Sequence, residues 1–517
     1  MEAAQLPDTQ RRQAVGWLPR GAASPGWDAA LRAAACVVGL VGVALRVFSL
    51  GRPGFWADEA WVAISTRVSG VEQFLVSLSH SPILWVALLR PLALLPLPPE
   101  IALRLLPLGF GIATLWLAWR LGGRLAGNLL GALLGLAVVA VDPVSVVWAQ
   151  QLKPYTAEAA LAVLAFLAAD AVVRYGRAAD VVVLALVLTL GTTCSNAQLL
   201  IAPPILAALA VRALLRGDRP ELRRIVIAGV GVSLWNAAWF AVFMRGWLTP
   251  MAGYFQSHFA PLADPAGLIR FVAVAFSRLL GPGLGVDGSG LALGGLAVLA
   301  MRPDARWAAL ALLLLAAELI ALSAAGSFPL DLQRTGLFVS TLFQVATAAA
   351  VGGLAVQLWA WRWLRPLALA LPLLFGFEIA RNHEWPPYPQ VQAEDLGPLV
   401  QEMERERQPG DHILLYANSV FVWGYYQART PVLLQATDHL AGGFFVQVDD
   451  PDVTMLGRDD PDGAIARVFT GARRVWFLGS RLRPGEEAAI RAQLAMHGRI
   501  VRDERRERAV LLLVEPP

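Results

Sequence analysis

The chain has 517 residues, of which 56% are hydrophobic and only 16% are charged. Soluble domains average about 25% charged residues, so this composition excludes an ordinary soluble enzyme and is typical of a membrane protein. The net charge of +4 does not indicate nucleic acid binding, because the arginines occur in short clusters between apolar segments. The two cysteines, Cys36 and Cys194, provide neither a disulfide framework nor a metal-binding spacing.

Residues 1–28 contain several arginines, and we predict them to be a cytoplasmic N-terminal segment. A transmembrane domain then covers residues 29–380, with apolar stretches of roughly 20 residues, the length that crosses a bilayer. We predict about 11 transmembrane helices, at 29–50, 101–120, 125–142, 156–174, 180–194, 198–215, 223–243, 288–301, 307–324, 335–357 and 364–379. Two further apolar stretches, 82–98 and 266–281, are predicted to be helices in the membrane interface, because one is short and Pro-rich and the other is interrupted by arginines.

The loops between the predicted helices alternate in charge. Every second loop contains arginines, and the positive-inside rule places these loops in the cytoplasm. The other loops then lie outside, at residues 51–100, 143–155, 195–197, 244–287, 325–334 and 380–517. We therefore expect a reaction centre at the outer surface of the membrane, where these external segments meet.

The first external loop, residues 51–100, carries two adjacent acids, Asp58 and Glu59. A carboxylate at the boundary between lipid and water can take the proton from an attacking hydroxyl. Two neighbouring acids can also shift each other's pKa or hold a divalent cation. The alternative interpretation is a pair of solvated loop residues.

Farther along this loop, His80 stands just before Pro82 and an apolar helix. Imidazole donates and accepts hydrogen bonds, so His80 is a candidate for binding a sugar or a phosphate. The alternative is an interfacial histidine at the start of a helix.

The second external loop contains Gln151, Lys153 and Tyr155, and Lys153 is the only lysine of the chain. Lys153 lies at the start of a predicted helix, and a helix N-terminus with an adjacent ammonium favours an anion such as a phosphate. Gln151 could bind sugar hydroxyls. An aromatic and cationic anchor at the membrane interface is the alternative interpretation.

Arg334 stands in the external loop before the helix predicted at 335–357. A planar guanidinium at this position can bind a phosphate through two parallel hydrogen bonds. The alternative is an arginine whose stem lies in the membrane while its head group pairs with Asp331.

Residues 381–517 are rich in charge and are predicted to be a soluble extracytoplasmic α/β domain. An amphipathic helix at 395–407 and a second helix near 485–498 alternate with apolar strands, which is typical of a small layered fold. The strands are predicted at 412–417, 473–480, 498–504 and 509–515. The acidic segment 442–463 is interpreted as a solvated loop, with binding of a cation or an acceptor glycan as the alternative. The domain lacks a Gly-rich phosphate-binding motif, so no cofactor is assigned to it.

Several fragments resemble motifs of the GT-C superfamily of polyprenyl-phosphate-sugar glycosyltransferases. The resemblance is to the family 39 branch, which is related to protein O-mannosyltransferases and lipid A aminoarabinose transferases. The matching stretches are WADEA at 56–60, HSP at 80–82, RLLP at 104–107, WAQQLKPY at 148–155 and FPLDLQR at 328–334. No single fragment is specific, but their order and their common side of the membrane cover about residues 40–350.

The resemblance implies that Asp58 in the first loop is catalytic, with Glu59 as its neighbour. It also implies a lipid-phosphate site built from basic residues of later external loops, here Lys153 and Arg334. The chain departs from the family at Gln151, where many relatives have Glu. An amide cannot act as a base or bind a cation as a carboxylate does, so this position does not support a metal that bridges the two loops.

These observations predict an inverting glycosyltransferase of the bacterial plasma membrane. The donor would be a polyprenyl-phosphate sugar, and the acceptor a glycan, lipid or protein of the cell envelope. Asp58 would be the base, while Lys153, Arg334 and Tyr155 would bind the donor phosphate and His80 and Gln151 the sugar or the acceptor. The alternatives are a transporter or flippase of lipid-linked sugars, which would show internal repeats and broken helices, and a non-catalytic protein that binds the envelope.

Overall fold

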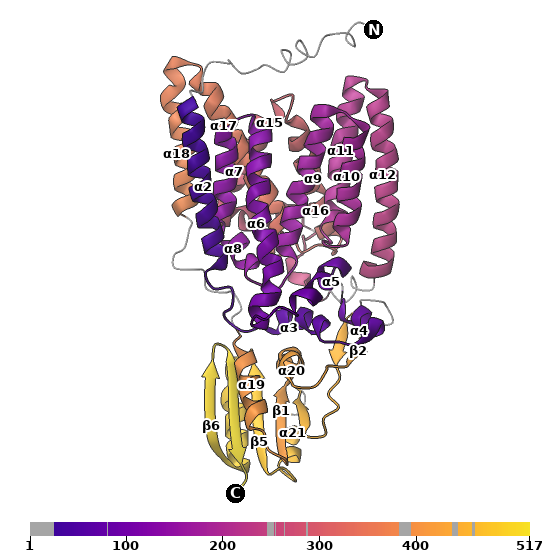
Figure 1. Cartoon of the computed structure of the whole chain (residues 1–517), viewed down its shortest axis with the longest axis vertical. Coiled ribbons are helices and arrows are strands. Elements are labelled where there is room, and N and C mark those ends of the chain that lie inside the picture. The colour runs from indigo at the N-terminus through magenta and orange to yellow at the C-terminus, as the bar shows by residue number, and fades with distance from the viewer. Residues whose placement is uncertain are drawn as a thin grey trace.

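The structure is a computed structural model of the chain. It describes residues 25–79, 81–245, 253, 255–262, 264–285, 288–381, 394–436, 443–457 and 461–517. Helices form a bundle up to Arg381, and a smaller α/β domain lies at one end of this bundle (Figure 1). This architecture confirms the predicted fold class, a polytopic helical membrane protein with a C-terminal α/β domain.

Nine helices in the described part of the chain are long and apolar enough to cross a membrane. They are α2 (Pro25–Val47), α6 (Pro99–Ala126), α9 (Tyr155–Tyr175), α11 (Gln198–Arg216), α12 (Arg219–Trp239), α14 (Pro265–Leu284), α16 (Arg306–Ala324), α17 (Leu337–Trp359) and α18 (Arg365–Arg381). A bent pair, α7 (Leu129–Val141) and α8 (Pro143–Ala149), turns by 61° between its halves. The shorter apolar helices are α5 (Ile83–Leu92), α10 (Ala178–Thr192) and α15 (Gly288–Ala300).

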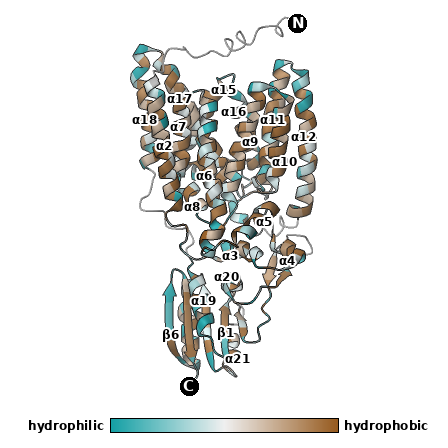
Figure 2. Cartoon of the chain, in the orientation of Figure 1, coloured by the Kyte–Doolittle hydropathy of each residue, from teal (hydrophilic) through white to brown (hydrophobic). Residues whose placement is uncertain are grey.

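The helix α17 forms the centre of the bundle, and 89% of its apolar stretch is buried. It packs against α7, where a Cβ atom added to Gly352 would lie 2.5 Å from the backbone of Gly131. Small residues permit such close approach, which membrane helices need because packing rather than the hydrophobic effect holds them together. The peripheral helices α2, α12 and α18 are only 17% buried over the same length, and most of their outer surface is apolar (Figure 2).

Short turns connect the helices at the end of the bundle that lies away from the α/β domain (Figure 1). Gly127 and Gly176 end α6 and α9 in the left-handed region, with φ of 70° and 64°, which glycine adopts without steric cost. Arginines gather at this end. Arg302 donates a hydrogen bond of 2.8 Å to the carbonyl of Ala126, and Arg224 donates one of 2.8 Å to that of Gly176. The grouping agrees with the predicted set of arginine-bearing loops on one side of the membrane.

Loops that were predicted to be external meet at the opposite end of the bundle, which faces the α/β domain and is called the domain-facing end below. Asp58 of the first loop lies 3.6 Å from Arg334 of the loop before α17. Glu59 accepts a hydrogen bond of 2.6 Å from the backbone N–H of Leu152 in the second loop. The threading of the helices therefore brings these three distant loops to one side of the membrane.

The helix α14 lies at the domain-facing end, as predicted for residues 266–281, although its 20 residues are enough to cross a membrane. Ala260, just before α14, donates a hydrogen bond of 3.1 Å to Ser323 at the end of α16. Gln333 donates one of 3.1 Å to the carbonyl of Arg278, in the second half of α14. Its second half packs against α17, with the ring of Phe276 at 6.1 Å from that of Phe343 and Gly283 against Gln344.

Two helices that were predicted as full spans are shorter than a bilayer requires. α15 has 13 residues and α10 has 15. At 1.5 Å per residue these helices extend about 20 Å, whereas the hydrocarbon core of a bilayer is about 30 Å thick.

The C-terminal domain is built on a five-stranded sheet with the strand order β4-β1-β5-β7-β6. Its strands are β1 (Asp411–Tyr416), β4 (Val453–Leu456), β5 (Arg474–Ser480), β6 (Arg499–Arg506) and β7 (Ala509–Glu515). β1 pairs in parallel with β4 and β5, and the β6–β7 hairpin adds antiparallel strands on the other side. The central strands β1, β5 and β7 are buried almost throughout, so their continuous apolar sequences are those of strands covered on both faces.

Helices cover this sheet, and a small hairpin connects it to the first loop of the bundle. The helices are α19 (Leu396–Glu406), α20 (Val420–Tyr426), α21 (Pro461–Val468) and α22 (Glu486–His497), and the hairpin pairs β2 (Leu433–Gln435) with β3 (Phe444–Val446). The predicted strands and the two predicted helices are all present. The interpretation of 442–463 as a solvated loop was wrong, because this segment contains β3 and β4 and the latter extends the main sheet.

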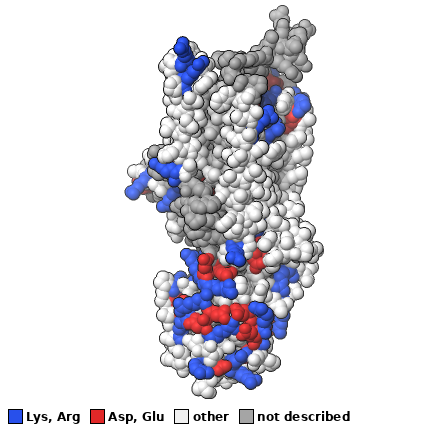
Figure 3. All heavy atoms as spheres, turned by 60° about the vertical axis from the view of Figure 1, so that its left-hand side comes forward, with Lys and Arg blue, Asp and Glu red and all other residues white. Residues whose placement is uncertain are grey.

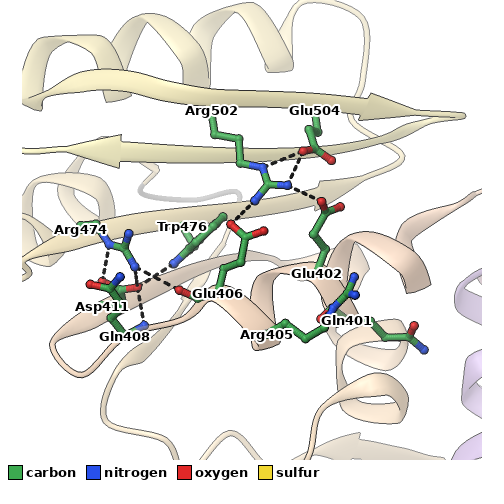
Figure 4. A network of polar contacts seen from close by, with 10 residues as sticks. All are labelled: Gln401, Glu402, Arg405, Glu406, Gln408, Asp411, Arg474, Trp476, Arg502 and Glu504. Carbon is green, nitrogen blue, oxygen red and sulfur yellow. Dashed lines mark hydrogen bonds and ion pairs between the residues drawn. The ribbon is translucent and has the colours of Figure 1, made fainter.

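A network of polar contacts connects α19 with the strands β1, β5 and β6 (Figure 4). Asp411, at the start of β1, is buried and accepts hydrogen bonds of 2.8 and 2.6 Å from Arg474 and one of 3.0 Å from the indole of Trp476. Burial alone would raise the pKa of Asp411, but these hydrogen bonds outweigh it and hold the pKa below its ordinary value. The stability that this carboxylate contributes is therefore present at neutral pH and is lost as the pH falls through the lowered pKa.

We expect Asp411→Asn to lower the free energy of unfolding of the C-terminal domain by about 2–4 kcal/mol, because Arg474 would keep no charged partner at this buried site. Asp503 provides a matched control, since it accepts two hydrogen bonds from Arg491 but is 45% exposed. Asp503→Asn should cost less than about 1 kcal/mol. Chemical denaturation of the full-length protein at pH 7 measures both, and equal effects would contradict the assignment.

Candidate active site

A short helix, α3 (Ala57–Ala63), carries the two acids of the first loop and lies between the bundle and the C-terminal domain (Figure 1). Arg104, near the start of α6, fixes its position. The guanidinium donates hydrogen bonds of 2.9 and 2.6 Å to the two carboxylate oxygens of Glu59. It also donates to the carbonyls of Leu50 and Pro53, at 3.0 and 2.9 Å. One side chain therefore ties α3 and the chain before it to α6.

Glu59 is fully buried, and it connects the first loop to the second. Besides Arg104 it binds the backbone N–H of Leu152, one residue before Lys153. Both carboxylate oxygens are thus engaged inside the protein. This geometry differs from the expectation that Glu59 faces the reaction centre beside Asp58. It suits a residue that sets the distance between the two loops.

Asp58 points to the other side of α3, and its side chain is 30% exposed. Its Oδ2 atom lies 3.6 Å from Nη1 of Arg334, which is 22% exposed. The guanidinium of Arg334 also lies 5.8 Å from the ring centre of Phe255. An accessible carboxylate and an accessible guanidinium thus lie side by side at the domain-facing end.

The alternative partner of Arg334 is engaged elsewhere. Asp331 lies 2.7 Å from Arg278 of α14 and 2.8 Å from the imidazole of His258. The sequence left open that Asp331 would pair with Arg334, but the structure assigns Arg334 to Asp58. Asp331 instead anchors the loop that carries Arg334 to α14.

Lys153 is a second cation near this pair. Its ammonium lies 6.0 Å from the ring centre of Trp56, two residues before Asp58. Burial lowers the pKa of Lys153; the carboxylate of Asp58 opposes this shift, and the guanidinium of Arg334 adds to it. A partly desolvated cation beside a second cation gains stability when an anion binds between them.

The C-terminal domain contributes a charged pair to the same place. Glu394 precedes α19 and is fully buried, with Oε1 at 2.8 Å from Nε of Arg481. Its other oxygen accepts a hydrogen bond of 3.4 Å from the N–H of Ala57, the first residue of α3. Arg481 lies 5.6 Å from the ring centre of Trp56. Trp56 is therefore in contact with one cation from the bundle and one from the C-terminal domain.

Burial raises the pKa of Glu394 to about 7, with Arg481 and the N–H of Ala57 opposing the shift and Asp58 adding to it. In the unfolded chain a glutamate titrates near 4.5. Between pH 4.5 and about pH 7, Glu394 is therefore protonated in the folded protein but ionised in the unfolded chain. Stability from this site therefore falls as the pH rises through that interval.

Two more backbone N–H groups of the first loop bind to the C-terminal domain. Gly54 donates to Asp395 at 3.0 Å, and Phe55 donates to the hydroxyl of Tyr426 at 3.2 Å. The helix α3 has no cap from its own sequence, so Glu394 supplies from another domain what an N-cap residue usually supplies. The geometry around Asp58 thus depends on the C-terminal domain.

Three predicted site residues remain, and the structure describes two of them. Gln151 is buried, and its Oε1 atom has no hydrogen-bond partner among the described residues. Tyr155 stands at the start of α9, with its ring 4.7 Å from that of Trp148. His80 lies outside the described residues.

The described side chains do not fit a divalent cation beside Asp58. Such an ion takes several oxygen ligands, but the oxygens of Glu59 are bound by Arg104 and Leu152, and Gln151 is neutral. No group of three His, Cys, Asp or Glu side chains able to hold a metal occurs in the part of the chain that the structure describes. We therefore derive no step through a metal ion.

Comparisons with known proteins show which solved structures have a similar fold. No family model matches the chain, and a search of curated proteins finds no match. Solved structures do match. ArnT from Cupriavidus metallidurans bound to undecaprenyl phosphate covers 95% of this chain and 98% of its own, with 13% identity and a TM-score of 0.53. The archaeal oligosaccharyltransferase AglB from Archaeoglobus fulgidus, in complex with an inhibitory peptide and a dolichol-phosphate, covers 92% of this chain and 73% of its own, with 12% identity and a TM-score of 0.52.

Both of these structures belong to the GT-C superfamily. Identity of 12–13% shows a common fold rather than a common activity. The chain therefore has the GT-C fold that the sequence motifs predicted. Its similarity to ArnT extends over the C-terminal domain as well as the bundle, since the match covers 95% of this chain.

We expect Glu394→Gln to change how stability depends on pH. In the wild-type protein the midpoint of thermal unfolding should fall as the pH rises from about 4.5 to about 7 more steeply than in the variant, because the variant has no proton to lose at this site. Differential scanning calorimetry of the two proteins across this range measures the difference. The exposed Glu507→Gln serves as a control, and parallel curves for wild type and Glu394→Gln would refute the assignment.

Proposed function

We propose that the protein is an inverting glycosyltransferase that moves a sugar from a polyprenyl-phosphate carrier to an acceptor hydroxyl. The observation that carries this proposal is the contact of 3.6 Å between Asp58 and Arg334, with Lys153 beside them. A candidate base and two cations that are far apart in the sequence thus lie near one another at the domain-facing end of the bundle. The GT-C fold supports the same kind of reaction, because ArnT and AglB both have a polyprenyl phosphate bound in the matching structures.

The two cations are suited to the donor phosphate. Arg334 can bind a phosphate with two parallel hydrogen bonds, and Lys153 supplies a compact charge at the start of α9. As the bond between the anomeric carbon and the phosphate oxygen breaks, negative charge collects on the leaving phosphate. Cations that are already in place stabilise this charge without rearrangement.

Asp58 is suited to act as the base that activates the acceptor. In its accessible position it can accept the proton of an acceptor hydroxyl while that oxygen forms the new bond to the anomeric carbon. The products are then the glycosylated acceptor, polyprenyl phosphate and a protonated Asp58. When the donor phosphate takes Arg334, the carboxylate of Asp58 is released for this role.

The sugar would lie between these groups. The unpartnered Oε1 atom of Gln151 can accept a hydrogen bond from a sugar hydroxyl. The proposal also assigns Tyr155 to the donor phosphate and His80 to the sugar. Glu59 is assigned to positioning, because Arg104 and Leu152 occupy its oxygens.

The orientation follows from the arginine-bearing loops at the far end of the bundle. The positive-inside rule puts that end in the cytoplasm of a bacterial plasma membrane, so the reaction centre and the C-terminal domain would be extracytoplasmic. The acceptor would then be a glycan, lipid or protein of the cell envelope. Labelling of engineered cysteines in intact cells tests this orientation.

We expect Asp58→Asn to reduce sugar transfer by about 100- to 10,000-fold, because the amide cannot take the proton. The variant should bind undecaprenyl phosphate at least as tightly as the wild type, because Asp58 no longer competes with the phosphate for Arg334. Transfer is measured as release of polyprenyl phosphate from a panel of polyprenyl-phosphate monosaccharides, with Glu72→Gln, an exposed acid of the same loop, as the control. Full activity of Asp58→Asn on a donor that the wild type uses would exclude Asp58 as the base. Binding without any transfer by the wild type would instead favour a transporter or a scaffold.

We expect Arg334→Ala and Lys153→Ala each to weaken binding of undecaprenyl phosphate by about 10- to 100-fold, since each removes a charge-assisted contact. Titration of the full-length protein in nanodiscs measures this affinity. Arg270→Ala removes an exposed charge from α14 and should leave the affinity unchanged. Equal binding by all three variants would show that the phosphate site lies elsewhere.

A further inference from the structure

We infer that an arginine-lined pocket of the C-terminal domain binds an oxyanion carried by the acceptor, so that the acceptor is a phosphate- or carboxylate-bearing glycan or glycolipid. The pocket has a volume of about 470 Å³. Its charged lining consists of Arg481, Arg483, Arg505, Arg506, Arg508 and Glu487. This inference rests on the proposed function, because it names the class of acceptor that the transfer would use.

The pocket arises where two loops of the sheet meet at the end that faces the bundle. One set of arginines follows β5, and the other belongs to the β6–β7 hairpin. The N–H of Arg481 donates a hydrogen bond of 3.1 Å to the carbonyl of Arg508, which holds the two loops together. The sheet therefore gathers five guanidinium groups, from segments that are separate in the sequence, around one hollow.

The acids near the pocket neutralise only part of this charge. Arg505 lies 2.8 Å from Glu487, and Arg506 lies 3.3 Å from Asp395. Arg481 pairs with the buried Glu394, as described above.

Arg483 and Arg508 have no ion pair or side-chain hydrogen bond with any residue that the structure describes, and both are exposed. Guanidinium groups match the planar geometry of carboxylates and phosphates, and they bind these groups with paired hydrogen bonds. The two unpaired arginines therefore give the pocket its capacity for an oxyanion.

The location of the pocket points to the acceptor rather than to the donor. Arg481 lines the pocket and also lies 5.6 Å from the ring of Trp56, two residues before Asp58. The donor cations Lys153 and Arg334 belong to the bundle, whereas Arg481 belongs to the C-terminal domain. In an inverting displacement the base activates the attacking group on the face of the sugar opposite to the leaving group. An anion held by the C-terminal domain is thus on the side from which an acceptor would approach Asp58.

The probe for this site is glucose 1-phosphate, with glucose as the neutral counterpart. We expect the full-length protein, in nanodiscs of phosphatidylcholine alone, to bind glucose 1-phosphate measurably and glucose not at all. The double variant Arg483→Gln/Arg508→Gln should bind glucose 1-phosphate at least about tenfold more weakly. The matched control is Arg473→Gln/Arg499→Gln, which removes the same charge from the far ends of β5 and β6 and should bind like the wild type. Isothermal titration calorimetry measures all four cases.

Each outcome has a defined meaning. Equal weakening in both double variants would reduce the site to general electrostatic attraction and overturn the inference, as would equal binding of glucose. If phosphatidylglycerol in the nanodiscs displaces glucose 1-phosphate, the arginines bind bulk lipid head groups, and the inference also fails. Binding of undecaprenyl phosphate is measured in parallel on the same proteins. Because it reports on Lys153 and Arg334, it separates a failure at this pocket from a failure of the proposed function.

Discussion

The buried ion pair between Glu59 and Arg104 is the constraint on which the arrangement of the site depends. A carboxylate and a guanidinium with almost no exposure are stable only together, because either charge alone would remain desolvated. Since Glu59 also binds the N–H of Leu152, this pair fixes the first loop, the second loop and α6 in one position. The adjacent Asp58 lies instead beside Arg334, with Lys153 nearby. One of the two neighbouring acids thus holds the scaffold in place, and the other is left accessible.

The C-terminal domain forms part of this scaffold. It binds three backbone N–H groups of the segment that leads into α3 and so determines where that helix starts. The surface of the bundle is largely uncharged, whereas charged side chains gather on the C-terminal domain (Figure 3). Charge is therefore concentrated where the protein meets water, with the candidate site at the junction of the two regions.

Patterns that repeat along the chain could be predicted from the sequence. Helix positions followed from apolar length, and the common side of Asp58, Lys153 and Arg334 followed from the alternation of arginine-bearing loops. The edge strand β4 was missed because it is short and surrounded by acidic residues, so its apolar alternation is weak. The role of α14 is not predicted by its length, since its 20 residues are enough to cross a membrane whereas several of its contacts lie at the domain-facing end.

Glu394 and Arg481 were missed for a different reason. Glu394 lies 337 positions from its partner Ala57, and the sequence around it has no motif that indicates a role beside α3. The different roles of the two carboxylates could be assigned only from the structure, because Asp58 and Glu59 are adjacent and nothing in the sequence distinguishes them. Arg104 of α6 distinguishes them, because it binds Glu59 and leaves Asp58 accessible. In the sequence, the RLLP fragment was only a weak indication of this contact.

Trp56 touches Lys153 from the bundle and Arg481 from the C-terminal domain, and this shared contact has a consequence for how such proteins diverge. A chimera that joined this bundle to the C-terminal domain of a distant relative would lose the partners of the loop before α3, even if both halves folded. The two modules are therefore expected to change as a pair during evolution. New binding preferences would then arise through substitutions within the β6–β7 hairpin rather than through exchange of whole domains.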